Sequence, residues 1–399
     1  MSPRLPRRGG TAEREPRPVR VPPLLLAALR DGAVPLRSDA TTVTPDAALR
    51  VAVVIPQFRR GSGGHHTIAD LVRGLEARGH ALSLWLVDEE GRHDGQNDVD
   101  LGELFQRFFG PVAAPVRRLA VAGDDDFGGP TPGDVDVLLA TGWQTVPAVL
   151  RLPGARARAY LVQDHEPEFY ATSAERDWAQ WTYRQGLHAV CASPWLADLV
   201  TREYDCSASS FDLGVAHEHY VPLPTHRRDD LVLFYARATT ARRATTLGVL
   251  ALQELHARRP DIEIALFGDG RRLATPFPHR HLGVLTPDAL AHAYASATVG
   301  VVLSMTNPSL VPTEMLACGL PVVDLASDSM LATFGDDGPI ALSPADPIAI
   351  AATVERLVDD LLERAERSRG GTALAATRTW PGAAEQVEAA LRTALQRAE

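Results

Sequence analysis

The chain alternates short runs of apolar, often β-branched residues with helical patterns, and this alternation limits the folds open to it. The run Leu49–Ile55 is almost wholly apolar, as in a strand buried on both faces of a parallel sheet. A turn containing Gly61–Gly64 follows, and apolar residues then recur at helical spacing from Ile68 to Leu75. Because the run Ala81–Val87 predicts the next strand, this part of the chain predicts a β-α-β unit.

The alternation continues and restarts after a polar segment. Residues 217–230 contain two prolines and show no periodicity, which is typical of a linker between domains. Residues 91–133 are rich in Gly, Asp and Pro and are expected to include a long loop. Further strands are expected at Val135–Ala140, Ala157–Val162, His188–Cys191, Leu231–Ala236, Ile262–Phe267, Val299–Leu303 and Pro321–Leu325.

Helix signals follow the strands of the second half. Thr286 and Pro287 open a helix that runs to about Ser296, because Pro is favoured at the first helical position. Asp346 is expected to cap a long helix. One apolar stripe on that helix comprises Val354, Leu357, Val358, Leu361 and Leu362. A short helix over Pro312–Cys318 and a final helix from Pro381 to about Ala398 complete the pattern.

These elements predict an α/β protein with two Rossmann-like, doubly wound domains that face each other across a cleft. Ligands of such sheets bind outside the carboxyl ends of the strands. The expected divisions are a disordered Pro/Arg-rich tail (1–46), a first Rossmann-like domain on the acceptor side (47–216), a linker (217–230), a second domain (231–378) and a C-terminal helix that can cross back to the first domain (379–399).

Composition excludes several classes of protein. With 399 residues, 45% of them hydrophobic, and a net charge of -10, the chain is neither wholly disordered nor a general nucleic-acid binder. No apolar run approaches the ~18 residues of a membrane span. The sequence contains no Lys, so any cation that binds phosphate must be Arg or His. Three scattered cysteines form no CxxC pair, which favours a reducing, cytoplasmic location without a structural zinc site.

The N-terminal segment is basic and does not resemble a secretory signal. Residues 1–20 hold six Arg and several Pro, which favours a disordered tail. A weak electrostatic anchor on the inner face of an anionic membrane is the alternative.

The turn Gly61–Gly64 lies where an anion site would need it, between a strand and a helix N-terminus. It lacks both the GxGxxG spacing of dinucleotide sites and a Walker lysine, which disfavours a dinucleotide-dependent oxidoreductase. A tight turn without a ligand is the alternative. His65 and His66 are candidate polar contacts in the cleft.

The second half carries the more specific pattern. Arg237 ends one predicted strand and Arg243 precedes the next helix, so both can converge on a diphosphate, which the planar guanidinium binds through two oxygens. In the segment Ser304–Val323, free N–H groups of a turn can hold a phosphate, and Glu314 can accept hydrogen bonds from ribose hydroxyls. Alternatively, Glu314 only stabilises a helix N-terminus.

From Leu231 onward the sequence resembles the donor-binding domain of GT-B glycosyltransferases, specifically family 4 (glycosyl transferases group 1). The matching positions are Ala236-Arg237, Arg243, Gly268-Asp269-Gly270, His281-Leu282-Gly283, Glu314–Val323 and Trp380. Within that family, the segments Val162–Tyr170, Phe234–Arg237 and Asn307–Gly319 resemble a bacterial rhamnosyltransferase subgroup.

The resemblance implies roles for individual residues. Arg237 and Arg243 would hold the donor diphosphate and stabilise the leaving group, and Glu166 is the third candidate catalytic residue. The implied donor-binding residues are Gly63, Gly64, Gly268, Val284, Leu285, Thr306, Ser309, Leu310 and Glu314. On the acceptor side the candidates are His65, Gln163 and Asp164. No metal or cofactor is expected, since the arginines and helix N-termini would replace a metal ion.

One position departs from the family pattern. Thr306 stands seven residues before Glu314, where the family has a first Glu that meets the transferred sugar. The implied function is metal-independent, retaining transfer of a hexosyl group, with dTDP-rhamnose as one candidate donor, to a glycan, lipid-linked or small-molecule acceptor. The alternative is a non-catalytic protein that binds nucleotide sugars or glycans, which Thr306 favours.

Other motifs are expected to be structural. Asp124–Asp126 superficially resembles a metal-binding DxD but lies in a Gly/Pro-rich loop. The pairs His217/His219 and His279/His281 have no third ligand at metal-binding spacing.

Overall fold

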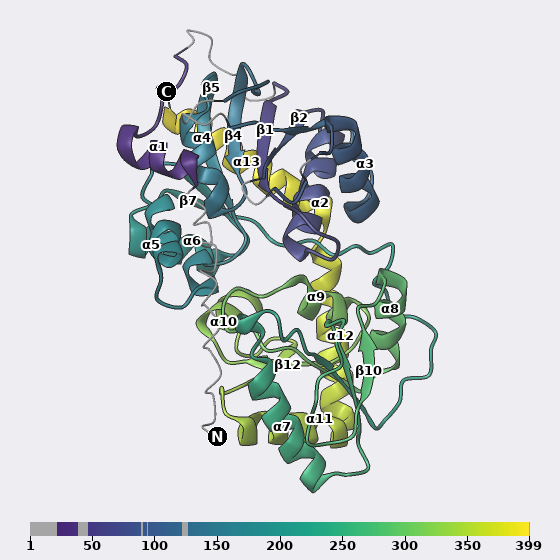
Figure 1. The fold of residues 1–399 in the computed structure, drawn as a ribbon. Coiled ribbons are helices and arrows are strands. Elements are labelled where there is room, and N and C mark those ends of the chain that lie inside the picture. Colours follow the sequence, from purple (N-terminus) through teal and green to yellow (C-terminus); the bar gives the residue numbers. More distant parts are fainter. Residues whose placement is uncertain (1–21, 39–46, 89–90, 94, 122–126, 399) are drawn as a thin grey trace, which may run out of the picture.

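The computed structural model describes residues 22–38, 47–88, 91–93, 95–121 and 127–398, which form two lobes, each built on a parallel sheet (Figure 1). The first sheet has the strand order β3-β2-β1-β4-β5-β6-β7. Its strands are β1 (Arg50–Pro56), β2 (Ala81–Val87), β3 (Val116–Arg118), β4 (Val135–Ala140), β5 (Ala155–Val162), β6 (His188–Cys191) and β7 (Ala208–Ser210). The central strands β1 and β4 are almost entirely buried, as expected for a sheet covered on both faces.

The second sheet has the order β10-β9-β8-β11-β12-β13. Its strands are β8 (Leu231–Tyr235), β9 (Glu263–Phe267), β10 (Arg280–Gly283), β11 (Val299–Val301), β12 (Val322–Leu325) and β13 (Ile340–Ser343). In each sheet the order reverses at one place, between β1 and β4 and between β8 and β11. Loops leaving the carboxyl ends of these strands diverge there and leave room for a ligand.

The helices of the first lobe are α2 (Gly63–Ala77), α3 (Asp98–Phe109), α4 (Val146–Arg151), α5 (Ala174–Thr182) and α6 (Pro194–Tyr204), with short 3-10 turns η1 (Trp143–Thr145) and η2 (Glu166–Phe169). Residues 91–133, which were expected to include a long loop, also contain α3 and β3, which the sequence analysis did not predict. Asn97 and Asp100 form a capping box that starts α3, a helix-start signal that the sequence analysis overlooked.

Part of the expected disordered tail is ordered, which corrects the prediction for residues 22–38. Helix α1 (Pro23–Asp31) buries Leu24 and Ala28 in the core beside α4. The following segment runs along the domain, where Val34 N donates to Leu150 O at 2.9 Å and Arg37 N to Ala155 O at 2.7 Å. Residues 1–21 and 39–46 lie outside the described residues.

The helices of the second lobe are η3 (Ala241–Arg243), α7 (Thr245–Arg258), α8 (Pro287–Ser296), α9 (Leu310–Ala317), α10 (Asp328–Phe334), α11 (Pro347–Asp359) and α12 (Leu361–Thr377). Asp346 caps α11 with its side chain, as predicted. Helix α8 begins at Pro287, as predicted, and the Thr286 side chain caps it. The prediction of one apolar stripe along a single long helix is wrong, because the helix ends before Asp360, whose carboxylate caps α12. Leu361 and Leu362 consequently project outward, 65% and 82% exposed.

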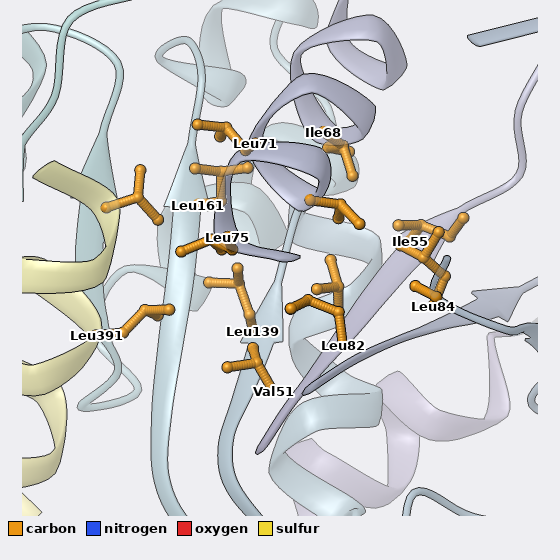
Figure 2. Packing of buried hydrophobic residues seen from close by; sticks show 14 of the residues in the cluster. Val51, Ile55, Ile68, Leu71, Leu75, Leu82, Leu84, Leu139, Leu161 and Leu391 are labelled. Atoms are coloured by element: carbon orange, nitrogen blue, oxygen red, sulfur yellow. The ribbon is translucent and has the colours of Figure 1, made fainter. Parts of the chain in front are cut away.

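The last helix, α13 (Trp380–Ala398), leaves the second lobe and packs against the first (Figure 1, yellow). Its Leu391 joins the core that α2 builds on the first sheet, together with Val51, Leu75 and Leu139 (Figure 2). Gly74 permits the close approach of α2, because a Cβ there would lie 2.5 Å from the Cβ of Ala384.

Candidate functional site

The Gly-rich turn joins β1 to α2 at the point where the first sheet reverses its strand order. A Cβ on Gly63 would meet nothing within 4 Å, so the N-terminus of α2 is open at this residue. Gly64 instead lies against Gln163, whose Nε2 donates to the Gly64 carbonyl at 3.2 Å. The structure therefore brings together the turn and one of the residues expected on the acceptor side.

His65 organises this turn from inside. Its Nδ1 lies 2.8 Å from Ser62 Oγ and its Nε2 lies 3.2 Å from the Pro56 carbonyl oxygen. The ring stacks on Phe109, with the centroids 5.6 Å apart. Burial lowers the pKa of His65 to about 4, so the imidazole is neutral near pH 7. Both ring nitrogens have partners within the protein, so His65 holds the turn, and its contact with an acceptor stays a prediction.

Glu166, a candidate catalytic residue, is buried within the first domain. Its Oε1 accepts a hydrogen bond from the Tyr160 hydroxyl at 2.6 Å, and its Oε2 accepts one from Trp143 N at 2.8 Å. Burial raises the pKa of Glu166 to about 7, with these two donors opposing the shift. Because both oxygens are used within the fold, the geometry indicates that Glu166 supports the turn after β4.

The side chain of Asp164, in the first domain, contacts residues of the second domain. Its Oδ2 lies 2.8 Å from Arg242 Nε, and its Oδ1 accepts a hydrogen bond from Asn307 N at 3.1 Å. The Asn307 side chain is itself buried and accepts a hydrogen bond from Ser193 Oγ at 2.6 Å. The predicted acceptor-side residue is thus a contact between the domains.

Arg243 is the more rigidly held of the two predicted diphosphate ligands. Its side chain is buried, and Nη1 donates to Ser304 Oγ at 3.3 Å. Ser304 in turn donates to Asp324 from its backbone N at 2.6 Å and from its hydroxyl at 2.9 Å. Burial raises the pKa of Asp324 to about 7, opposed by these donors. Arg237 is half-buried, and its Nη1 lies 3.4 Å from the Tyr235 hydroxyl.

Thr306 and Ser309 lie in the turn between β11 and α9, and Leu310 begins that helix. Thr306 is buried and Ser309 half-buried, and among the described residues neither hydroxyl oxygen has a hydrogen-bond partner. Ser309 is the N-cap residue of α9, yet its side chain makes no capping bond. Unpaired N–H groups at a helix start favour an anion.

Glu314 is the fifth residue of α9 and so lies beyond the first turn, where the helix dipole is strongest. The alternative that it only stabilises the helix N-terminus loses support from this position. Its side chain is half-buried, and burial raises its pKa to about 7, with the Tyr294 hydroxyl opposing the shift.

The remaining predicted donor contacts lie at the ends of β9 and β10. Gly268 has φ 97° and donates from its N to the Gly283 carbonyl at 2.9 Å. A Cβ on Gly268 would lie 2.5 Å from the Tyr235 ring, so this position requires glycine. Val284, which follows β10, is 68% exposed, whereas Leu285 is partly buried against the hydrophobic core of the second domain.

The sequence analysis missed Arg242 and Asn307. Arg242 stands beside Arg243 in the same short turn, and two adjacent arginines give no signal of which one faces inward. Asn307 follows Thr306 in a Pro-rich turn, where an Asn ordinarily predicts only turn chemistry. In the described part of the chain, no three His, Cys, Asp or Glu side chains gather as a metal site would require. Asp124–Asp126 lie outside the described residues.

Comparisons with known proteins agree with this two-domain arrangement. Residues 230–353 match the family model "WsaF, C-terminal domain". The O-antigen biosynthesis protein RfbC of Myxococcus xanthus is 31% identical over 245 residues, which are 59% of this chain and 19% of that protein. The chain therefore spans about a fifth of the length of this relative.

Similar solved structures cover nearly the whole chain. Sucrose-phosphate synthase from Thermosynechococcus elongatus superposes with a TM-score of 0.65 at 14% identity, covering 88% of this chain and 100% of that one. HepE of Anabaena, solved with UDP and glucose, superposes with a TM-score of 0.63 at 15% identity, covering 86% of this chain and 100% of that one. TarM of S. aureus, solved with UDP and glycan ligands, superposes with a TM-score of 0.66 at 7% identity, covering 86% of this chain and 99% of that one. Two parallel-sheet domains in this arrangement are the GT-B fold, and residues 230–353 of this chain match the WsaF C-terminal domain.

Proposed function

We propose that this protein is a glycosyltransferase that moves a hexosyl group from a nucleotide-diphosphate sugar to an acceptor in polysaccharide biosynthesis. The observation that carries the proposal is that one arginine and two hydroxyl side chains follow the two strands between which the second sheet reverses its strand order. Arg243 follows β8 there, while Thr306 and Ser309 follow β11. The match of this domain to the WsaF C-terminal domain and the similarity to an O-antigen biosynthesis protein support it.

The groups present suit a departing diphosphate. When the bond between the sugar C1 and the diphosphate oxygen breaks, negative charge grows on that oxygen. Arg237 and Arg243 would stabilise this charge, and the open start of α9 would add backbone N–H groups. Since Arg243 is already fixed by Ser304, little reorganisation is needed during the reaction.

We propose that transfer is metal-independent and retaining. The two arginines supply the positive charge that a divalent ion would otherwise provide. For a retaining outcome, the leaving diphosphate oxygen would accept the proton of the acceptor hydroxyl as the new C1–O bond forms on the same face. Full activity in excess chelator is the expected result, and an absolute requirement for Mg²⁺ or Mn²⁺ would overturn metal independence.

A rhamnosyl donor is the finer proposal, and Thr306 supports it. A hydroxyl there, in place of a carboxylate, removes one charged acceptor that would bind sugar hydroxyls, which suits a deoxy sugar. A panel of nucleotide sugars, tested by thermal shift and by product formation, should give the largest response with dTDP-rhamnose, because at equal concentration the ligand that binds most tightly stabilises the folded state most. A larger response to UDP-glucose or UDP-GlcNAc would contradict this choice.

The second candidate function is non-catalytic binding of nucleotide sugars or glycans, and the absence of a carboxylate at Thr306 favours it. Incubation of the purified protein with the donor separates the two proposals. Slow hydrolysis of the donor without acceptor, abolished in Arg243→Gln, supports the enzyme. Tight binding without turnover, for every donor and with extracted glycan or lipid-linked acceptors, supports the binding protein.

For location, we propose the cytoplasm, with the inner face of the membrane as the place of a lipid-linked acceptor. Among the described residues, no helix has the length and apolar character needed to cross a membrane. A soluble glycan acceptor would need no membrane contact.

A further inference from the structure

One carboxylate of the first domain contacts two loops of the second. Asp164 follows β5, and its side chain is 8% exposed. Its Oδ2 lies 2.8 Å from Nε of Arg242, in η3, and its Oδ1 accepts a hydrogen bond from Asn307 N, in the turn after β11, at 3.1 Å. Both oxygens of one buried carboxylate therefore contact the other domain, and Oδ1 also accepts a hydrogen bond from His165 N of its own domain at 2.9 Å.

The two loops are also joined to each other. Met305 N donates to the carbonyl oxygen of Arg242 at 3.1 Å. Together with the two contacts of Asp164, this bond closes a ring of three interactions. In the chain, Arg243 directly follows Arg242, and Thr306 lies between Met305 and Asn307. The guanidinium of Arg242 also lies over the Phe169 ring of the first domain, 3.9 Å from its centroid.

Asn307 adds a second buried connection. It is 1% exposed, and its Nδ2 donates to the carbonyl oxygens of Gln163 at 3.1 Å and Ala192 at 3.2 Å. Its Oδ1 accepts from Ser193 Oγ, which also caps α6. Separation of the domains would break these bonds and require water to replace them at each buried group.

We propose that Asp164 and Asn307 form a latch between the domains that positions both walls of the donor site when the cleft closes. They act as positioning residues, since neither is among the residues assigned to the donor. The inference rests on the proposed function for its link to donor binding. The latch itself is a property of the two domains and can be tested without a donor.

The physical reason for such coupling is that the latch exists only while the domains touch. A donor that binds the aligned η3 and β11–α9 loops more tightly would shift the population towards the closed form. Conversely, a variant that weakens the latch lowers the fraction of competent protein, and the apparent donor affinity falls by the same factor.

The experiment compares Asp164→Asn, Asn307→Ala and the control Asp136→Asn in the full chain. Asp136 is also a buried carboxylate of the first domain, with Arg50 and Arg156 beside it. It stands at the opposite, amino end of the sheet, early in β4, so its loss destabilises the domain without touching the latch. Titration calorimetry with UDP and with dTDP measures affinity, and small-angle X-ray scattering measures the radius of gyration.

The expected result is a donor-diphosphate affinity about tenfold lower in Asp164→Asn and Asn307→Ala, within the usual range for coupled sites, and an increased radius of gyration for both. The control should match the parent in both measurements. Combining Asp164→Asn with Arg242→Gln should add little further loss, because the two residues act through one contact.

Each outcome decides between the proposals. If the parent binds UDP or dTDP and the latch variants match it in affinity and radius, the latch is overturned and the proposed function stands. If the parent binds no nucleotide, the proposed function fails, and scattering alone decides the latch. An equal change in Asp136→Asn would show that general destabilisation, rather than the latch, causes the effect.

Discussion

Arg242 and Arg243 are neighbours in the chain and have different partners. Arg243 is tied to Ser304 within the second domain, whereas Arg242 pairs with Asp164 of the first. An arginine paired directly with a carboxylate is less available to a phosphate than one whose side-chain hydrogen bond goes to a hydroxyl. At the residue scale, therefore, Arg242 links the two domains, and Arg243 is the arginine that we propose as the donor ligand.

Glu314→Gln tests the donor site at a single position. Above its pKa of about 7 Glu314 is ionised, so in that pH range the substitution keeps the size of the side chain but replaces a charge-assisted hydrogen bond, which contributes about 1.5–3 kcal/mol. We expect the affinity for the donor nucleotide to fall roughly ten- to a hundredfold. Titration calorimetry on both proteins measures this. Equal affinities, with only a slightly lower melting temperature, would remove Glu314 from the site.

Glu388 gives a pH-dependent prediction. Burial alone would raise its pKa, but hydrogen bonds from Arg78, Arg392 and His80 outweigh burial and lower it to about 2. Arg78 Nε lies 2.5 Å and Arg392 Nη2 lies 2.6 Å from its oxygens. Because the folded-state pKa is depressed, the stabilisation is present above the usual value of 4.5 and is lost as the pH falls towards 2.

Glu388→Gln should therefore lower the free energy of unfolding by about 1–2 kcal/mol at pH 7. The difference from the parent should shrink steadily between pH 4.5 and pH 2, the window set by the two pKa values. Urea unfolding at several pH values provides the measurement. A difference that stays constant with pH would mean that the carboxylate charge makes no contribution.

At the element scale, α1 shows how an N-terminal segment can be part of a domain. Its Leu24 and Ala28 pack beside α4, and backbone bonds at Val34 and Arg37 continue the contact. Arg158 adds side-chain hydrogen bonds to the carbonyl oxygens of Val34 and Leu150. The segment 22–38 thus covers core residues of the first domain.

Two truncations separate this segment from the residues before it. Removal of residues 1–21 should leave the melting temperature and the activity on a soluble acceptor nearly unchanged. Removal of residues 1–38 uncovers α4 and should lower the melting temperature by several degrees, since burial of a Leu side chain contributes about 1.5–3 kcal/mol. Thermal unfolding by circular dichroism distinguishes the two. Loss of binding to anionic vesicles after the shorter truncation would instead support the electrostatic anchor.

At the scale of the whole molecule, α13 makes the two domains interdependent. It begins beside the second domain and buries Val387, Leu391 and Leu395 in the core of the first. Gly214 lies against Trp380, where a Cβ would approach the indole to 2.7 Å. A helix shared in this way means that the core of the first domain is complete only when residues 380–398 are present.

Deletion of residues 379–399 should leave the first domain without part of its core. We expect loss of its cooperative unfolding, while the second domain, whose two cores contain no residue of α13, keeps a separate transition. Differential scanning calorimetry measures this, with Leu361→Ser as a control at an exposed position of the second domain. A deletion variant with the parental transition would show that α13 is dispensable.

Much of the fold was already determined by the sequence. The predicted runs Leu49–Ile55 and Leu231–Ala236 are strands within a residue or two, because a run buried on both faces must be apolar at every position. The starts of α8 and α11 were equally predictable from Thr286 and Asp346, since side-chain capping is a local interaction. Leu361 and Leu362 were misassigned because apolar spacing cannot detect a capping break at Asp360.

The sequence by itself determined two parallel-sheet domains and the loops where their strands end, because strand burial, turn chemistry and helix capping depend on neighbouring residues. Only the tertiary structure decided which side chains of those loops have partners within the protein. Glu166 is held inside the first domain and Asp164 is paired with Arg242, while Thr306 and Ser309 keep hydroxyls without described partners. These differences arise from contacts between segments far apart in the chain, such as that between Asp164 and Asn307. Local sequence patterns depend only on neighbouring residues and therefore cannot predict such contacts.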